Sequence, residues 1–155
     1  MISRENLKTI KKITEEFFEK ITFEVSIDFL PQRDQSLPIS IKAEEPQILI
    51  GERGETLFEI QHLLKTILKR KAGIEEIFYL DIDINDYKKK KTTYLKEMAR
   101  SLVEEVLLTK KEKILPPMTA YERRIIHLEL ADNPNVTTES IGQEPERRVA
   151  VRPYP

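Results

Sequence analysis

The sequence predicts an α+β protein of two small domains, each a roughly three-stranded sheet covered by helices. Segments in which apolar and polar residues alternate, typical of half-buried strands, lie between segments in which apolar residues recur every three or four positions, typical of amphipathic helices. The 155 residues are enough for one domain or for two small ones. A run of four lysines separates two periodic patterns, so we expect domains over residues 1–85 and 86–155.

The first domain is expected to begin with an amphipathic helix over residues 3–20, because apolar side chains recur there at intervals of three and four. Two strands follow, over residues 23–29 and around residues 39–41, where apolar residues alternate with polar ones. Between them, residues 31–38 are rich in turn formers and have a proline at each end. This composition predicts a loop.

A short apolar helix, residues 48–50, is expected to lead into a Gly-x-x-Gly segment at 51–54, after which a longer helix begins near Thr56. The longer helix has an apolar stripe that we expect to face the core. The stripe consists of Ile60, Leu63, Leu64, Ile67 and Leu68. Gly73 ends this helix, and alternation predicts a third strand over residues 80–84.

The second domain is expected to begin with a long helix that the lysine run opens and that keeps a helical apolar period. Two adjacent prolines then break the pattern before a shorter helix over about residues 119–131. The remaining segments, 136–141 and 147–152, flank a stretch of turn formers. We expect them to form a hairpin.

Composition excludes several functional classes. The chain has no cysteine, which excludes disulfide frameworks, thiolate zinc sites and cysteine nucleophiles, and which is compatible with a reducing compartment. Charges are scattered through the first residues and no long apolar run follows, so neither a signal peptide nor a membrane span is expected. A cytoplasmic protein with no membrane partner is the expectation.

The charge distribution neither requires nor excludes a nucleic-acid partner. The net charge of −1 argues against one, because phosphate binding rests on lysine and arginine. Residues 1–84 carry 12 basic and 16 acidic side chains, whereas residues 85–155 carry 14 and 11. The second domain is therefore the more basic of the two, by a modest margin.

The Gly-x-x-Gly segment is the first candidate binding site. Without a Cβ atom at either glycine, a phosphodiester can approach the main chain closely, and the free N–H groups at the start of the next helix attract its charge. Arg53 could add a charge-assisted hydrogen bond, whereas the charge of Glu52 would repel a phosphate. The alternative is that the segment is only a turn.

The run ILIGERGETLFEIQHLLKTILKRKAG, with the strands on either side, resembles a KH domain of the bacterial type II arrangement. The resemblance implies a loop that clamps about four nucleotides of a single strand beside an apolar groove. It implies a groove wall that includes residues 48–50 and part of the last strand. The implied backbone contacts are Gly51, Glu52, Arg53 and Gly54.

Arg123 and His127 are the second candidate site. Residues four apart lie on one face of a helix, so these two could reach one anion together, with the arginine on phosphate oxygens and the imidazole on a phosphate or a base. Ile125, Ile126 and Leu128 are expected to cover the other side. The alternative is that Arg123 pairs with a nearby glutamate and His127 is a surface or core residue.

This part of the chain resembles the domain family named for an Arg-x-x-x-His signature, which binds single-stranded nucleic acid. The match extends to the E-R-R at 122–124, the T-x-S-x-G at 138–142 and the P-x-R-R-V at 145–149. It leaves RNA and single-stranded DNA both open as ligands. The contacts that it implies are Arg123, Arg124, His127, Arg147 and Arg148.

From about residue 20 to the end, the two resemblances occur in the order found in the bacterial Jag/KhpB family. That likeness implies a single-stranded RNA-binding protein, an RNA chaperone or post-transcriptional regulator, without cofactor. A KH-domain protein or a second copy of the chain is the expected protein partner. The N-terminal domain that the family usually carries is not recognised, so no membrane-linked role is carried over.

A further basic segment supports either a functional or a neutral interpretation. It could follow phosphates between the domains, or it could be a solvated helix face. The segment consists of Lys88, Lys89, Lys90 and Lys91.

Two other functional classes remain as alternatives. Asp81 and Asp83 fall on the same side of a predicted strand, so a metal-dependent nuclease is conceivable. The sequence offers no further metal ligand, no nucleophile elbow and no Walker loop, so we expect neither catalysis nor a metal site. A non-catalytic protein-interaction scaffold is the other alternative, and salt-dependent RNA binding would distinguish it.

Overall fold

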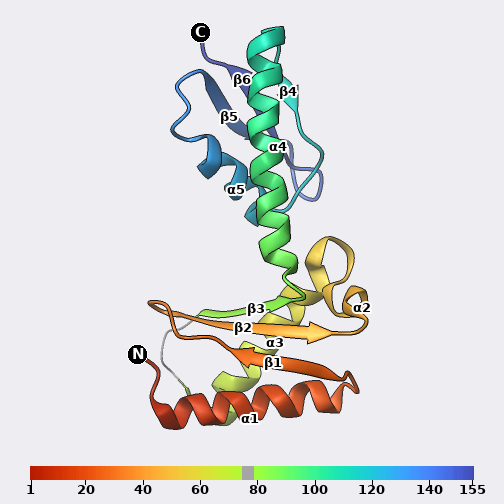
Figure 1. The fold of residues 1–155 in the computed structure, drawn as a ribbon, viewed down its shortest axis with the longest axis vertical. Helices are drawn as coiled ribbons and strands as arrows, with labels where there is room; N and C mark the ends of the chain where they lie inside the picture. Colours follow the sequence, from red (N-terminus) through yellow and green to blue (C-terminus); the bar gives the residue numbers. More distant parts are fainter. Residues whose placement is uncertain (75–78) are drawn as a thin grey trace. The chain divides into compact units, whose positions relative to one another are not determined.

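A computed structural model describes residues 1–74 and 79–155 (Figure 1). The chain divides into two compact units, Met1–Lys88 and Lys89–Pro155. Each unit has its own three-stranded sheet and its own hydrophobic core, which confirms the predicted α+β class. The sequence placed the domain boundary near Asp86, and the helix that leads into the second unit begins at the next residue.

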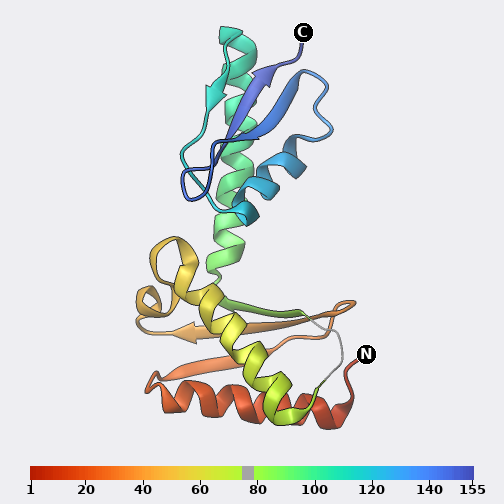
Figure 2. The same cartoon turned by 180° about the vertical axis from the view of Figure 1, so that it is seen from behind.

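The first unit alternates helices with the strands of one mixed sheet. Its sheet has the order β1-β2-β3, with β2 antiparallel to β1 and parallel to β3. The helix α3 crosses the sheet in Figure 2, and its apolar residues join those of α1 and of the sheet in one core. In chain order the elements are α1 (Arg4–Lys20), β1 (Val25–Phe29), β2 (Ser36–Ala43), α2 (Pro46–Ile50), a 3₁₀ turn (Glu52–Gly54), α3 (Glu55–Ala72) and β3 (Tyr79–Ile84).

The core of the first unit follows from the alternation in its strands. Ile39 lies opposite Ile82, and Ile41 lies opposite Ile84, in the parallel pair of strands, and all four side chains are buried. Leu57, Ile60, Leu64 and Leu68 of α3 are also buried, as the predicted stripe requires. The assignment of Leu63 to the same stripe is wrong, because its side chain is half exposed at the margin of the helix.

Pro38 was predicted to end a loop, but it lies inside β2, in the centre of the sheet. Pro38 O accepts a hydrogen bond from Leu30 N at 3.0 Å, one residue beyond the end of β1. A strand residue directs its N–H and its carbonyl to the same neighbour, so the donor that proline lacks would point past the end of β1. No ladder bond to β3 is lost, which is why a central strand tolerates this proline.

The second unit packs two helices on an antiparallel sheet of order β4-β6-β5. Its core joins Leu95, Ala99 and Val106 of the long helix with Ile126 and with the central strand. The strand β4 was not predicted, because two residues are too few to show alternation. The elements are α4 (Tyr87–Thr109), β4 (Lys113–Ile114), α5 (Ala120–Leu130), β5 (Val136–Ile141) and β6 (Arg148–Pro153).

The start of α5 is fixed by a capping box. The Thr119 side chain accepts a hydrogen bond from Glu122 N, and the Glu122 side chain accepts one from Thr119 N. This reciprocal cap sets where the helix begins and therefore which residues face the sheet. Of the helices in the described part of the chain, none combines the length and the apolar character that a membrane span requires.

Candidate nucleic-acid interface

The GERG loop, Gly51–Gly54, joins α2 to α3 and has an unusual backbone. Gly51, Arg53 and Gly54 all have positive φ, at 73°, 53° and 80°. A Cβ atom at Gly51 would lie 2.1 Å from Thr56 Oγ1, so this position accepts no side chain without a shift of its neighbours. The two glycines therefore have a structural requirement of their own, beyond any ligand.

The loop presents its two middle residues to solvent. Glu52 and Arg53 are exposed, Gly51 is half-buried and Gly54 is buried. Gly54 is also the N-cap residue of α3 and supplies no side-chain cap. The start of an 18-residue helix thus lacks a capping oxygen, which suits an anion, although the exposed carboxylates of Glu52 and Glu55 lie at the same helix end.

The predicted apolar groove wall is only partly available. Ile48 is 57% exposed, and Ile50 is half-buried, but Leu49 is buried in the core and cannot contact a ligand. The assignment of Leu49 to the wall is therefore wrong. Its place in α2 turns it inward, because α2 packs on α3.

The two aspartates of β3 are held by Lys88. Its Nζ atom lies 2.8 Å from Asp81 Oδ1 and 2.8 Å from Gln61 Oε1, and its backbone N–H donates to Asp83 Oδ1 at 2.9 Å. The described residues contain no group of three or more histidine, cysteine or acidic side chains that could hold a metal ion. The pair of carboxylates is thus tied to a lysine instead of lying open for a cation.

Arg123 is 7% exposed and makes two contacts with its guanidinium group. Nη1 donates to Met118 O at 2.8 Å, and Nη2 lies 2.8 Å from Glu144 Oε1, in the turn between β5 and β6. The ion pair is the one considered as the alternative interpretation of this arginine. Arg123 thereby connects the start of α5 to the β5–β6 turn.

His127 lies against β5, with both ring nitrogens engaged. Nδ1 is 2.7 Å from Thr138 Oγ1, and Nε2 is 2.8 Å from Ser140 Oγ. Burial, and then the nearby positive charge of Arg123, lowers the pKa of His127 from 6.5. The imidazole is therefore neutral at pH 7, and its half-buried ring is fixed by its edge to two hydroxyl groups.

The predicted basic residues around this helix differ in accessibility. Arg124 is exposed, whereas Arg147 and Arg148 are half-buried. Arg148 Nε donates to Glu146 O at 3.2 Å. Among the described residues, Arg147 Nε is buried without a hydrogen-bond partner.

One residue on α5 was assigned to the wrong face. Ile125 and Ile126 are buried as predicted, but Leu128 is 63% exposed. Leu128 follows Arg124 by four positions and therefore lies beside it on the outer face of the helix. The outer face of α5 consequently combines an arginine and an apolar side chain next to His127.

The lysine run is not a uniform solvated face. Lys88 is committed to Asp81, and Lys91 lies 3.4 Å from Glu122 Oε1 and 6.0 Å from the centroid of the Tyr94 ring. Lys89 and Lys90 are exposed. Two of the four side chains thus have structural partners.

Thr138, Ser140 and Glu144 are site residues to which no role was assigned from the sequence. The first two fall within the T-x-S-x-G match, and their spacing of two puts both hydroxyls on one face of a strand. That spacing is a signal that could have identified them as partners of His127. No such signal marks Glu144, because its contact depends on how the turn folds back.

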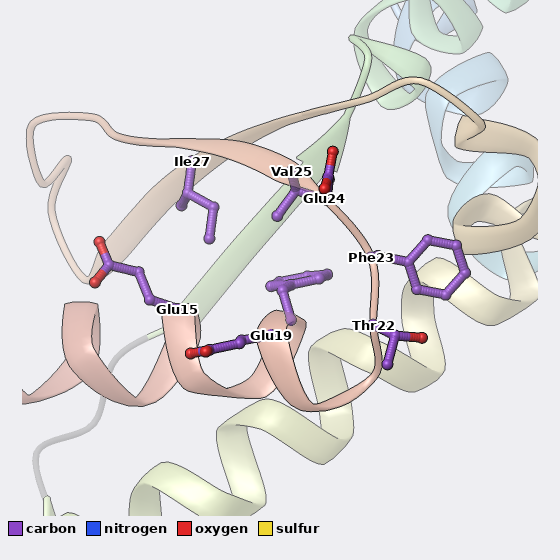
Figure 3. Close-up of a pocket in the computed structure, with 8 residues that line it drawn as sticks. Glu15, Glu19, Thr22, Phe23, Glu24, Val25 and Ile27 are labelled. Atoms are coloured by element: carbon purple, nitrogen blue, oxygen red, sulfur yellow. The ribbon is translucent and has the colours of Figure 1, made fainter.

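The first unit also contains a cavity of about 460 Å³ between α1 and β1 (Figure 3). Glutamates surround an apolar floor in this cavity, so it would repel a phosphate backbone and does not belong to the candidate interface. Its lining residues are Glu15, Phe18, Glu19, Thr22, Phe23, Glu24, Val25 and Ile27.

Comparison with known proteins identifies relatives of the chain. Residues 93–153 match the model of the domain family that is named for its Arg-x-x-x-His signature. The chain is 27% identical, over 97% of its length, to a Clostridium symbiosum protein named RNA-binding protein KhpB, of which it spans 69%. Proteins of that name from Lactiplantibacillus plantarum and Bacillus subtilis are 33% and 34% identical over 84% and 72% of the chain. The chain spans 39% and 53% of these two proteins.

Proposed function

Because the chain is a KhpB-like protein whose residues 93–153 match the Arg-x-x-x-His domain family, we propose that it binds single-stranded RNA and is not an enzyme. The match to that domain family is the observation that carries this proposal, since it includes His127 with both of its hydroxyl partners. The names of the relatives point to binding and not to catalysis.

In the proposal, residues 1–85 act as a KH-type domain. The element order and the combination of an antiparallel with a parallel strand pair support this assignment, together with an exposed loop between α2 and α3. Arg53 would pair with a phosphate, while the backbone at Gly51 and Gly54 would let the strand approach. Glu52 would face the same strand and weaken the contact.

Residues 86–155 would supply the second contact. His127 is neutral, so its part would be to stack its ring on a base rather than to pair as a cation. Arg124 would reach phosphates from the exposed face of α5, with Arg147 and Arg148 contributing from the hairpin. Arg123 would reach the RNA only from its buried position.

The cellular role in this proposal is that of an RNA chaperone or post-transcriptional regulator. A KH-domain protein or a second copy of the chain would be its protein partner. A protein-interaction scaffold without RNA binding is the alternative. Lys89 and Lys90 would extend the phosphate contact, since both are exposed.

The proposal is tested by titrating the full chain with a short, unstructured RNA at two salt concentrations. Affinity should fall steeply as salt rises, because each phosphate contact contributes a slope of about −0.7 for a single strand. A scaffold would show no salt-dependent binding to this RNA.

Arg53→Asp tests the first contact, and Arg33→Asp is the matched control, because both arginines are exposed in the same unit. The first variant should lose about tenfold in affinity, as expected when a charge-assisted hydrogen bond is lost. Equal affinities of the two variants would remove the GERG loop from the proposal.

A further inference from the structure

The turn between β5 and β6, residues 142–147, directs two carboxylates at arginines of the second unit. Glu144 Oε1 lies 2.8 Å from Arg123 Nη2, and Glu146 Oε2 lies 3.5 Å from Arg148 Nη2. Both arginines belong to the set proposed to contact RNA. The turn therefore occupies, with its own carboxylates, positions that suit phosphate oxygens.

The two pairs differ in how much each arginine depends on its partner. The side chain of Arg123 is 8% exposed, whereas that of Arg148 is 36% exposed. A buried guanidinium group is costly without an anion, so Arg123 requires one at all times. Water can solvate Arg148 when its partner leaves, so only the first pair imposes an obligatory exchange.

The partner of Arg123 can leave more easily than the arginine can. The Glu144 side chain is 58% exposed, and it needs only to swing into water. The guanidinium group stays anchored through Met118 O, which accepts from Nη1 at 2.8 Å. Arg123 would therefore remain in place with one donor edge open when Glu144 departs.

A second arginine converges on the same point. Met118 N donates to Arg147 O at 3.1 Å, so Arg123 and Arg147 both bind the backbone of Met118. Within the described part of the chain, Arg147 Nε is buried and lacks a hydrogen-bond acceptor. The turn thus joins a buried donor without an acceptor to a buried arginine that has an exchangeable one.

On this basis, and resting on the proposed RNA binding, we infer that Glu144 is an internal substitute for an RNA phosphate, which the strand must displace to reach Arg123. Glu144 then positions Arg123 in the free protein and sets a threshold for binding. A phosphate that replaces it gains a buried guanidinium partner and releases the carboxylate to solvent. The residue lowers affinity in exchange for keeping the site assembled.

The test is Glu144→Gln in the full chain, titrated with the same short RNA. The amide oxygen can still accept from Arg123, so the fold is retained, but the competing charge is gone. Affinity should rise about fivefold, the range of a partly exposed ion pair. Glu104→Gln, an exposed residue of α4, is the control for net charge and should change affinity much less.

The salt dependence gives a readout that a purely structural role would not change. In the natural chain, the released Glu144 recruits a cation, which offsets the counterion that the phosphate releases. Without that carboxylate, the slope of log affinity against log salt should steepen by about 0.7. A structural role for Glu144 predicts weaker binding at an unchanged slope.

The outcomes separate the inference from the proposed function. If the natural chain fails to bind RNA at low salt, the proposed function is wrong. If it binds, and Glu144→Gln binds equally or more weakly, the inference alone is overturned. Should that variant unfold, Glu144→Asp keeps the charge and shortens its reach, and its affinity should also exceed that of the natural chain. An unchanged or lower affinity of Glu144→Asp then overturns the inference.

Discussion

The ring of Tyr87 occupies the space that a side chain on Gly54 would need, since a Cβ atom there would lie 2.9 Å from Tyr87 Cε1. Tyr87 is the first residue of α4, and Gly54 is the last of the GERG loop. The contact closes one side of the loop while Glu52 and Arg53 stay exposed. It also makes Gly54 a structural glycine in a loop proposed for binding.

Gly54→Ala should therefore destabilise the first unit more than Gly73→Ala does. Both glycines have positive φ, but a Cβ atom at Gly73 meets nothing within 4 Å. The backbone strain common to both costs about 1 kcal/mol, and the contact with Tyr87 should add about 1–2 kcal/mol at Gly54 alone. Urea unfolding of the two variants measures the difference. Equal losses would mean that the Tyr87 ring moves aside at no cost.

The stability of the chain should depend on His127 at mildly acidic pH. Because the folded-state pKa lies below 6.5, the unfolded chain takes up a proton first as pH falls. The contribution is complete above pH 6.5 and declines through the interval down to the lowered pKa. Thermal unfolding between pH 7.5 and about 5.5 should show a smaller decline for His127→Gln than for the natural chain. His62→Gln, at an exposed position, should decline as the natural chain does.

Thr138 should matter to RNA binding only through His127. Thr138→Val removes the hydroxyl at 2.7 Å from Nδ1 while keeping the shape of the side chain. We expect a loss of about threefold to fivefold in affinity, the range of one hydrogen bond, and no further loss in a His127→Ala background. Thr137→Val, on the exposed side of β5, is the control. Additive losses in the double variant would contradict the positioning role.

Arg123 should affect stability as well as binding. Lysine at this position has one charged head and cannot hold both Met118 O and Glu144, so Arg123→Lys should cost about 1–2 kcal/mol of unfolding free energy. Arg124→Lys, on the exposed face, should cost almost nothing. Urea unfolding distinguishes them, and equal stabilities would contradict the anchoring contacts. Changing Arg123 and His127 together to Ala should lower RNA affinity further, and it requires the same unfolding control.

Most of the fold could be predicted from the sequence because its signals are local. The stripe in α3 and the alternation in β3 each report which side faces the core, and both were confirmed apart from Leu63. Pro38 and the strand β4 were not predictable in the same way. A proline is acceptable in a strand only where the neighbouring strand has ended, and two residues carry no periodic signal.

The site was predictable as a set of residues but not as a set of contacts. The spacing of Arg123 and His127 places them on one side of α5, yet it cannot tell that one side chain turns inward to Glu144. That contact joins a helix to a turn about twenty residues later, where the path of the hairpin decides the distance. The lowered pKa of His127 likewise depends on burial, which only the packed unit defines.

The most direct test of the account is ultraviolet crosslinking of the full chain to a short single-stranded RNA, with the crosslinked residues identified by mass spectrometry. The account predicts crosslinks in the GERG loop and around His127 on α5 and β5. Crosslinks confined to other surfaces, such as the acidic cavity between α1 and β1, would contradict it, as would none at all.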